Sequence, residues 1–133
     1  MADHSPNITI SVSPGEVIDR LTIAEIKSER IADPAKLAHV RVELARLATA
    51  AKVAIADTDE LRGLRAELKA VNEKLWVIED DIRDCERQGD FGAAFVALAR
   101  AVYRTNDQRV AVKRRINQAL GSELIDEKSY APY

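Results

Sequence analysis

Seven charged, amide or aromatic side chains interrupt the apolar pattern of this sequence, and Arg109 is the clearest case. It falls on the apolar side of a helical pattern that includes Val102 and Ile116. A guanidinium group in such a place needs an acceptor, and carboxylates are the obvious acceptors. We therefore expect Arg109 to be largely buried and hydrogen-bonded to a carboxylate, for which Glu25 and Glu79 are the best candidates.

The seven side chains together could bind an anionic ligand. Arg109 would hold the anion with a fork of donors, and Lys113 would act as a point charge. Asparagine amides both donate and accept hydrogen bonds, which suits sugar hydroxyls or the edge of a base, and a tryptophan ring supplies a flat apolar wall. The predicted ligand-binding residues are Glu25, Asn72, Trp76, Glu79, Asn106, Arg109 and Lys113.

A purely structural interpretation of the same residues stays open. A buried ion pair at Arg109 can fix the register of a helix bundle without any ligand. Glu25 can lie at the rim of the core with its carboxylate in water, and Glu79 can pair with Arg83 along one helix. By its position Asp19 is an ordinary residue of a polar helix face. The pattern alone does not decide between a polar network and a binding pocket.

Several other kinds of site lack the residues that they require. The GxxxxGK motif of phosphate-binding loops is absent, and neither His4 nor His39 has neighbours at metal-ligand spacing. The single cysteine, Cys85, excludes an internal disulfide. The 20 basic and 22 acidic residues give a net charge of −2, whereas nucleic-acid binders are usually basic. We expect neither a cofactor nor a nucleic-acid partner.

Segments for membrane insertion or export are not recognisable. No apolar run approaches the roughly 18 residues that a membrane-spanning helix needs. The first residues, MADHSPNITISVSPGE, have neither the basic start nor the apolar core of a signal peptide. We therefore expect no membrane insertion and a cytoplasmic location.

A strong helix start follows a short extended segment near the N-terminus. Residues 7–12 alternate apolar and polar side chains, which predicts a short strand or an extended arm. Ser13 can then cap a helix, Pro14 suits the first helical position, and Glu16 can complete a capping box. The first predicted helix covers about residues 14–31.

Three more helices are predicted from similar boundaries. Asp33-Pro34 opens the second helix, and the polar residues 57–59 offer caps for the third. Gly89 can take the left-handed conformation that ends the third helix, and Asp90 can cap the fourth. These helices reach about residues 56, 87 and 120.

The helices predict an all-α fold. Short connections between four helices indicate antiparallel neighbours, and the three later helices carry apolar stripes at spacings of three and four. The first helix is apolar around much of its circumference, so we expect it to be buried on more than one side. The fold class is an antiparallel four-helix bundle with a short extended N-terminal arm. Residues 1–133 form one domain, with an arm at 1–12, a four-helix core at 13–121 and a docked C-terminal tail at 122–133.

Four stretches of the chain resemble one family. They are SPGEVIDRLTIAEIKSERI at 13–31, NEKLWVIEDDIRD at 72–84, LARAVYRTNDQRVAVKRRIN at 98–117 and DEKSY at 126–130. This is a family of small bacterial all-helical proteins of unassigned function, and related segments are found with tetratricopeptide-repeat or glycosyltransferase-like proteins. The resemblance implies a role in glycan or surface polysaccharide assembly, with a protein partner.

A second, weaker resemblance is to the all-α nucleoside triphosphate pyrophosphohydrolases. Glu16-x-x-Asp19 and Lys113-x-x-x-Asn117 are similar to parts of that family's magnesium and phosphate sites. The Glu-Glu-x-x-Glu motif of the family is absent here. The resemblance implies a Mg²⁺-dependent hydrolase of nucleotides or nucleotide-sugars as the alternative function.

We expect a non-enzymatic binding or assembly module that forms a homo-oligomer and has a polar pocket between helices. The two functions differ in what the carboxylates must do. The hydrolase needs at least three of them within reach of one Mg²⁺ ion, whereas the binding module needs no metal.

Overall fold

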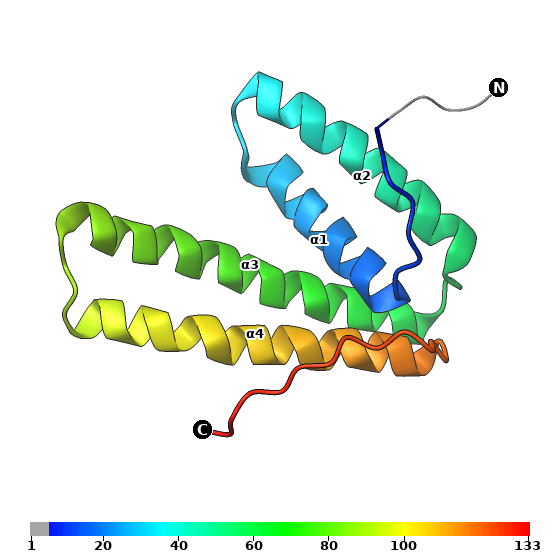
Figure 1. Ribbon diagram of the computed structural model, residues 1–133. Coiled ribbons are helices and arrows are strands. Elements are labelled where there is room, and N and C mark those ends of the chain that lie inside the picture. Colours follow the sequence, from blue (N-terminus) through cyan, green and yellow to red (C-terminus); the bar gives the residue numbers. More distant parts are fainter. Residues whose placement is uncertain (1–5) are drawn as a thin grey trace.

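The computed structural model describes residues 6–133, and it is all-α (Figure 1). The predicted four-helix bundle is confirmed, and no strand occurs within the described range. His4 and the first five residues of the predicted arm lie outside that range. The helices are α1 (Pro14–Arg30), α2 (Pro34–Ala54), α3 (Asp59–Gln88) and α4 (Ala93–Ala119).

Three of the described helices begin, and α3 ends, at the residues whose chemistry predicts these boundaries. The hydroxyl of Ser13 accepts a hydrogen bond from the backbone N–H of Glu16 at 3.2 Å, and Asp33 and Thr58 cap α2 and α3 in the same manner. Gly89 ends α3 with a φ of 65°, a left-handed conformation that glycine adopts without strain.

The start of α4 corrects the prediction. Asp90 does not cap this helix, because its carboxylate accepts a hydrogen bond at 3.1 Å from the backbone N–H of Gly92 and closes a turn before the helix. Gly92 is the N-cap residue instead, and no side chain caps α4, which begins at Ala93. The N-cap of α4 therefore lies two residues later in the chain than the capping pattern predicted.

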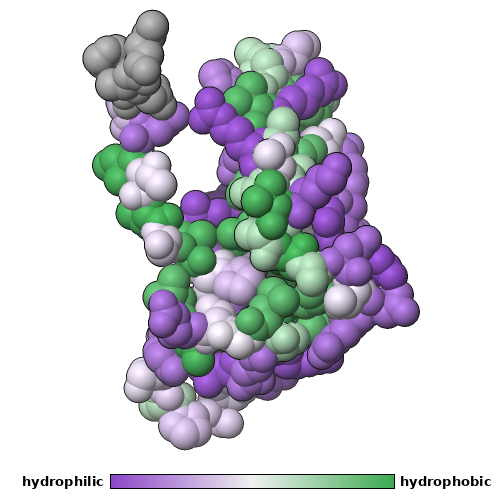
Figure 2. All heavy atoms as spheres, turned by 90° about the vertical axis from the view of Figure 1, so that its right-hand side faces the viewer, coloured by the Kyte–Doolittle hydropathy of each residue, from purple (hydrophilic) through white to green (hydrophobic). Residues whose placement is uncertain are grey.

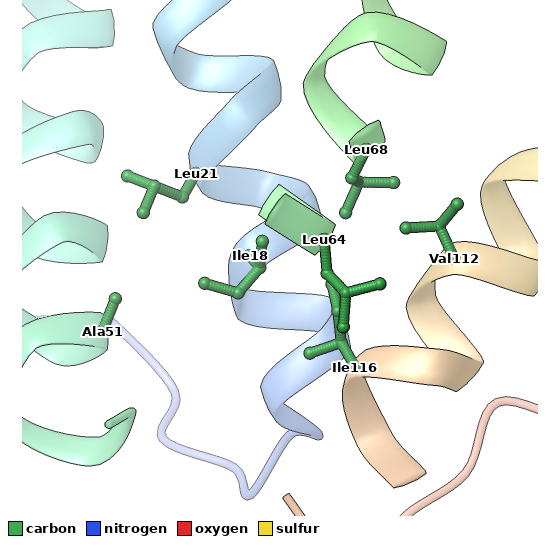
Figure 3. Close-up of a cluster of buried hydrophobic side chains, with 7 residues drawn as sticks. All are labelled: Ile18, Leu21, Ala51, Leu64, Leu68, Val112 and Ile116. Carbon is green, nitrogen blue, oxygen red and sulfur yellow. The ribbon is translucent and has the colours of Figure 1, made fainter. Parts of the chain in front are cut away.

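Helix α1 is the central element of the fold. It contacts each of the other three helices, whereas the backbone of α2 approaches that of α1 alone among the described helices. Helices α3 and α4 form a long antiparallel hairpin, and the shorter pair α1–α2 crosses one end of it (Figure 1). The main hydrophobic cluster lies around α1 (Figure 3), and its buried members are Ile18, Leu21, Ala51, Leu64, Leu68, Val112 and Ile116.

The hydrophobic cluster reaches the surface at the end of the molecule where α2 connects to α3. The half-buried side chains of Val17, Ile55, Leu61 and Leu120 pack against the cluster from the helix termini. Figure 2 shows this end, where hydrophobic side chains form a band flanked by hydrophilic ones. No helix in the described range is long and apolar enough to cross a membrane.

Residues 6–12 form an arm that pairs with no strand. They lead away from the start of α1 (Figure 1), and the side chains of Ile8 and Ile10 are 87% and 70% exposed. The alternating pattern of this segment therefore produces an extended arm and not a strand, because the described part of the chain offers no strand to pair with.

Candidate functional site

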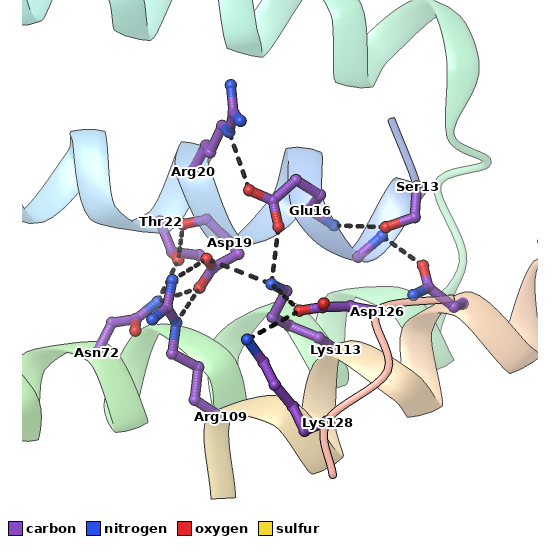
Figure 4. Close-up of polar contacts among 12 residues, drawn as sticks. Ser13, Glu16, Asp19, Arg20, Thr22, Asn72, Arg109, Lys113, Asp126 and Lys128 are labelled. Carbon is purple, nitrogen blue, oxygen red and sulfur yellow. Dashed lines mark hydrogen bonds and ion pairs between the residues drawn. The ribbon is translucent and has the colours of Figure 1, made fainter. Parts of the chain in front are cut away.

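A buried polar network joins α1, α3 and α4 around Asp19, whose exposed fraction is 1% (Figure 4). One carboxylate oxygen of Asp19 accepts hydrogen bonds from Nδ2 of Asn72 at 3.0 Å and from Nε of Arg109 at 2.9 Å. The other oxygen accepts a bond from Nη2 of Arg109. Asp19 is thus held by a bidentate arginine and an amide, the arrangement that a buried carboxylate requires.

This network corrects three expectations. The partner of Arg109 is Asp19 and not Glu25 or Glu79, so the predicted acceptors were wrong. Asp19 is buried instead of lying on a polar face, because α1 is enclosed by three helices and has little solvent-facing surface. Arg109 is only partly buried and not largely buried as predicted, since its side chain is 30% exposed.

Thr22 completes the inner part of the network. Its hydroxyl donates a hydrogen bond to the backbone oxygen of Asp19 at 2.8 Å and accepts one from Asn72 at 3.0 Å. Within residues 6–133, no buried side-chain nitrogen or oxygen lacks a hydrogen-bond partner. The inner part is therefore a satisfied structural network, with no free group left to receive a ligand.

Lys113 lies among three carboxylates, although only 6% of the residue is exposed. Its ammonium nitrogen is 2.7 Å from Glu16, 3.5 Å from Asp126 and 3.9 Å from Asp19. The hydrogen bond from Lys113 is the main reason why the pKa of Glu16 is lowered, against the opposing effect of burial. The pKa of Arg109 is raised, chiefly by its hydrogen bonds to Asp19.

The lowered pKa of Glu16 predicts a dependence of stability on pH. A depressed carboxyl pKa stabilises the folded chain above the unfolded value of 4.5, and this contribution is lost as the pH falls through the folded pKa. We expect Glu16→Gln to lose about 1–2 kcal/mol at pH 7. Thermal melts should show that the gap to the parent closes as the pH is lowered below 4.5.

Glu67→Gln is the matched control for this experiment. Glu67 is also paired with a basic residue, Arg115 at 2.8 Å, but both side chains are about half exposed. Exposed ion pairs contribute little to stability, so the difference in stability between Glu67→Gln and the parent should be small at every pH. A Glu16→Gln gap that stays constant from pH 7 to pH 3 would contradict the role assigned to Glu16.

Gly15 brings the start of α1 against α4. Its backbone N–H donates to the side-chain oxygen of Asn117 at 2.7 Å. A Cβ at residue 15 would lie only 2.6 Å from the backbone oxygen of Lys113 and 2.8 Å from Asn117. Only glycine allows this approach, which places Glu16 and Asp19 within reach of α4.

A groove of about 1040 Å³ lies between α4 and the C-terminal tail. Three of the seven predicted site residues line it: Asn106, Arg109 and Lys113. Among the described residues, the amide of Asn106 and the Nη1 atom of Arg109 make no hydrogen bond, so both can bind a ligand. The lining also includes Glu16, Val102, Tyr103, Asp107, Val110, Ala111, Arg114, Asp126, Lys128, Tyr130 and Tyr133.

The tail forms one wall of the groove through contacts along α4. The hydroxyl of Tyr133 donates to Asp107 at 2.5 Å, and its ring contacts that of Tyr103 edge to face with centroids 5.2 Å apart. The bond to Asp107 raises the pKa of Tyr133, because the carboxylate favours the protonated phenol. Nearer the core, Asp126 is 3.5 Å from Lys113. The tail is therefore tied to α4 through Asp126 and through Tyr133.

The other four predicted site residues lie outside the groove. Asn72 is buried behind Arg109, in the inner network. Glu25 pairs with Arg65 at 2.6 Å and with Lys69 at 3.6 Å, and so joins α1 to α3.

The remaining two of these four residues lie farther along α3. Glu79 pairs with Arg83 on the same helix, and both side chains are exposed. Trp76 is half-buried, one turn beyond Asn72. The seven predicted residues therefore do not form a single pocket.

The described residues do not form the metal site that the hydrolase alternative requires. Within residues 6–133, no group of three or more histidine, cysteine or acidic side chains could hold a metal ion. The carboxylates of Glu16, Asp19 and Asp126 instead surround the ammonium group of Lys113. Their arrangement gives the hydrolase alternative no support.

Comparison with known proteins identifies one family. Residues 8–133 match a "Family of unknown function (DUF6165)", so the match covers nearly the whole chain. No curated protein and no solved structure matches the chain.

Proposed function

The chain belongs to this DUF6165 family, and we propose that it is a non-enzymatic binding module whose ligand site is the groove between α4 and the C-terminal tail. The observation that carries the proposal is the pairing of two free polar groups in one groove. Arg109 and Asn106 both line it, and neither Nη1 of Arg109 nor the amide of Asn106 has a hydrogen-bond partner in the described part of the chain.

The unpaired nitrogen of Arg109 favours a ligand with an anionic group. Nε and Nη2 of Arg109 donate hydrogen bonds to Asp19, and these bonds hold the guanidinium group in place. The third nitrogen, Nη1, is therefore already oriented, and the side chain loses little further freedom when a ligand binds. Arg114 and Lys128 also line the groove, where Arg114 pairs with Glu127 at 3.3 Å and Lys128 with Asp126 at 4.0 Å. Lys113 is neutralised by its carboxylates, so it positions the site and does not itself contact the anion.

The neutral groups suit a sugar-like part of the same ligand. The amide of Asn106 can donate to and accept from a hydroxyl, and the ring of Tyr103 offers an apolar face beside it. Sugar phosphates and nucleotide-sugars combine an anion with such a part. This ligand class is consistent with a role in glycan or surface polysaccharide assembly, together with a protein partner, and we include that role in the proposal.

A thermal-shift screen tests the proposed site. The panel contains inorganic phosphate, glucose 1-phosphate, a nucleoside diphosphate and a nucleotide-sugar, each with and without Mg²⁺. A ligand at a hundredfold its Kd should stabilise the parent by about 2.7 kcal/mol, which raises Tm by several degrees. Asn106→Ala should remove most of this shift, because it deletes one of the two free groups.

Gln108→Ala provides the matched control. Gln108 is an exposed amide on the same helix but does not line the groove, so its shift should equal that of the parent. The proposal fails if no compound on the panel shifts Tm. It also fails if a shift survives Asn106→Ala unchanged.

A further inference from the structure

The α3–α4 hairpin is covered by α1 along only part of its length. Asn72 on α3 and Arg109 on α4 both contact Asp19 of α1, and Arg30 at the end of α1 lies 3.8 Å from Glu73. Beyond that ion pair, both helices of the hairpin continue without a third helix above them (Figure 1).

On α3, the side that faces α1 continues into the uncovered half as a ridge. Asn72, Trp76, Glu79 and Arg83 follow one another at spacings of four, three and four, which places them on one side of the helix. Because Asn72 contacts α1, the other three lie on the same side beyond it. Trp76 is half-buried, and the side chains of Glu79 and Arg83 are 48% and 64% exposed.

On α4, an apolar strip runs beside this ridge. Phe95 and Val102 lie on the same side of α4 as Arg109, at intervals of seven residues, and Phe91 lies just before the start of the helix. Phe91 is 55% exposed, and its ring contacts that of Phe95 edge to face at 5.3 Å. We call the side formed by the ridge and this strip the open hairpin face. It consists of Trp76, Glu79, Arg83, Phe91, Phe95, Leu98 and Val102.

The charges of the ridge are complementary to those of a reversed copy of itself. A two-fold axis across α3 at Asp81 would place Glu79 of one copy opposite Arg83 of the other, and the same pair would form twice. Trp76 of one copy would then face the helical turn that carries Arg87 in the other copy. A guanidinium group can stack on a tryptophan ring in a cation–π interaction. Two opposite charges one turn apart on the same side of a helix are what this antiparallel self-pairing needs, in either order.

The same axis brings the apolar strips together. Asn72 and Arg109 lie side by side at Asp19, and the two helices are antiparallel. The axis therefore crosses α4 near Arg100, and Leu98 of one copy would pack on Val102 of the other. The apolar and the charged parts of the face thus fit a second copy under one symmetry operation.

We propose that the open hairpin face is the interface of a two-fold symmetric dimer of this chain. The two hairpins form an antiparallel four-helix bundle between copies, which supplies each hairpin with the cover that α1 gives to its other half. Glu79 and Arg83, which pair within each helix, also pair between the two copies, and these cross pairs set the antiparallel register, as charged flanking positions do in helix pairs.

Charge reversal tests this interface without disturbing the core. Light scattering across a range of protein concentrations should show a dimer for the parent. Glu79→Arg and Arg83→Glu each place like charges opposite one another at both symmetric positions, so each should raise the dimer Kd at least tenfold. The double variant Glu79→Arg/Arg83→Glu exchanges the charges and should restore the parent Kd.

Arg62→Glu is the control, because Arg62 is an exposed, ion-paired arginine near the other end of α3. It should leave the dimer Kd unchanged, and circular dichroism should show that every variant keeps its helices. A parent that stays monomeric up to several hundred micromolar overturns the proposal. A dimer that both single variants leave intact, or that the double variant does not restore, overturns it as well.

Discussion

Replacing Arg109 with alanine is expected to lower the free energy of unfolding by about 3 kcal/mol. The variant leaves the carboxylate of Asp19, which is 1% exposed, with only Asn72 in hydrogen-bond contact and Lys113 at 3.9 Å. Removing one partner of a buried pair is costly because the remaining charge has lost both water and its closest counter-ion. Urea unfolding of the parent and the variant measures the difference.

Substitutions on the other side of the pair provide the controls. Asp19→Asn should cost less than Arg109→Ala, because the side chain of Arg109 is 30% exposed and can reach water when its partner is neutral. The double variant Asp19→Asn/Arg109→Met should be more stable than the sum of the single losses predicts, since no unpaired charge remains. An Arg109→Ala protein as stable as the parent would show that the pair does not hold α1 to α4.

The fold was largely predictable because its boundaries depend on local chemistry. Ser13 with Pro14, Thr58 and Gly89 each determine a helix end through their own side chain or backbone, and the structure places the ends there. Asp90 shows the limit of that reasoning. An aspartate can close a turn as well as cap a helix, and the choice depends on the geometry of the following residues.

The candidate site was only partly predictable because burial is a property of the assembled helices. Arg109 was found from its position in an apolar stripe, but the same test assigned Asp19 to a polar face. That assignment fails because α1 contacts all three other helices, which the pattern of α1 alone cannot reveal. The apolar residues around much of its circumference were the one indication that a polar residue of α1 would be enclosed.

The arrangement of the bundle also follows from lengths that the sequence already indicates. Helix α1 has 17 residues and α3 has 30, so they span about 25 and 45 Å at 1.5 Å per residue. A helix of the shorter length cannot cover the longer one. The periodic stripes do not show which half of the hairpin stays open. The contacts of Asn72 and Arg109 with Asp19 show it, because they place α1 over one half of the hairpin.

The second large effect is expected for Gly15→Ala, which should lose about 3 kcal/mol of stability. The new Cβ would lie 2.6 Å from the backbone oxygen of Lys113, and a backbone atom inside α4 cannot turn aside as a flexible side chain can. The helices must separate, which weakens the 2.7 Å hydrogen bond from Gly15 to Asn117 and the Glu16–Lys113 ion pair. Thermal and urea unfolding of the purified variant measure this loss.

Gly63→Ala is the matched control and should change stability in the opposite direction. Gly63 lies within α3, and a Cβ there meets nothing within 4 Å. Alanine at such a helical position should stabilise the chain by about 0.5–1 kcal/mol, because glycine loses more backbone freedom on folding. Opposite signs for the two substitutions would show that Gly15 is needed for the contact of α1 with α4. Equal signs would contradict the close approach on which the Asp19 network and the groove beside it depend.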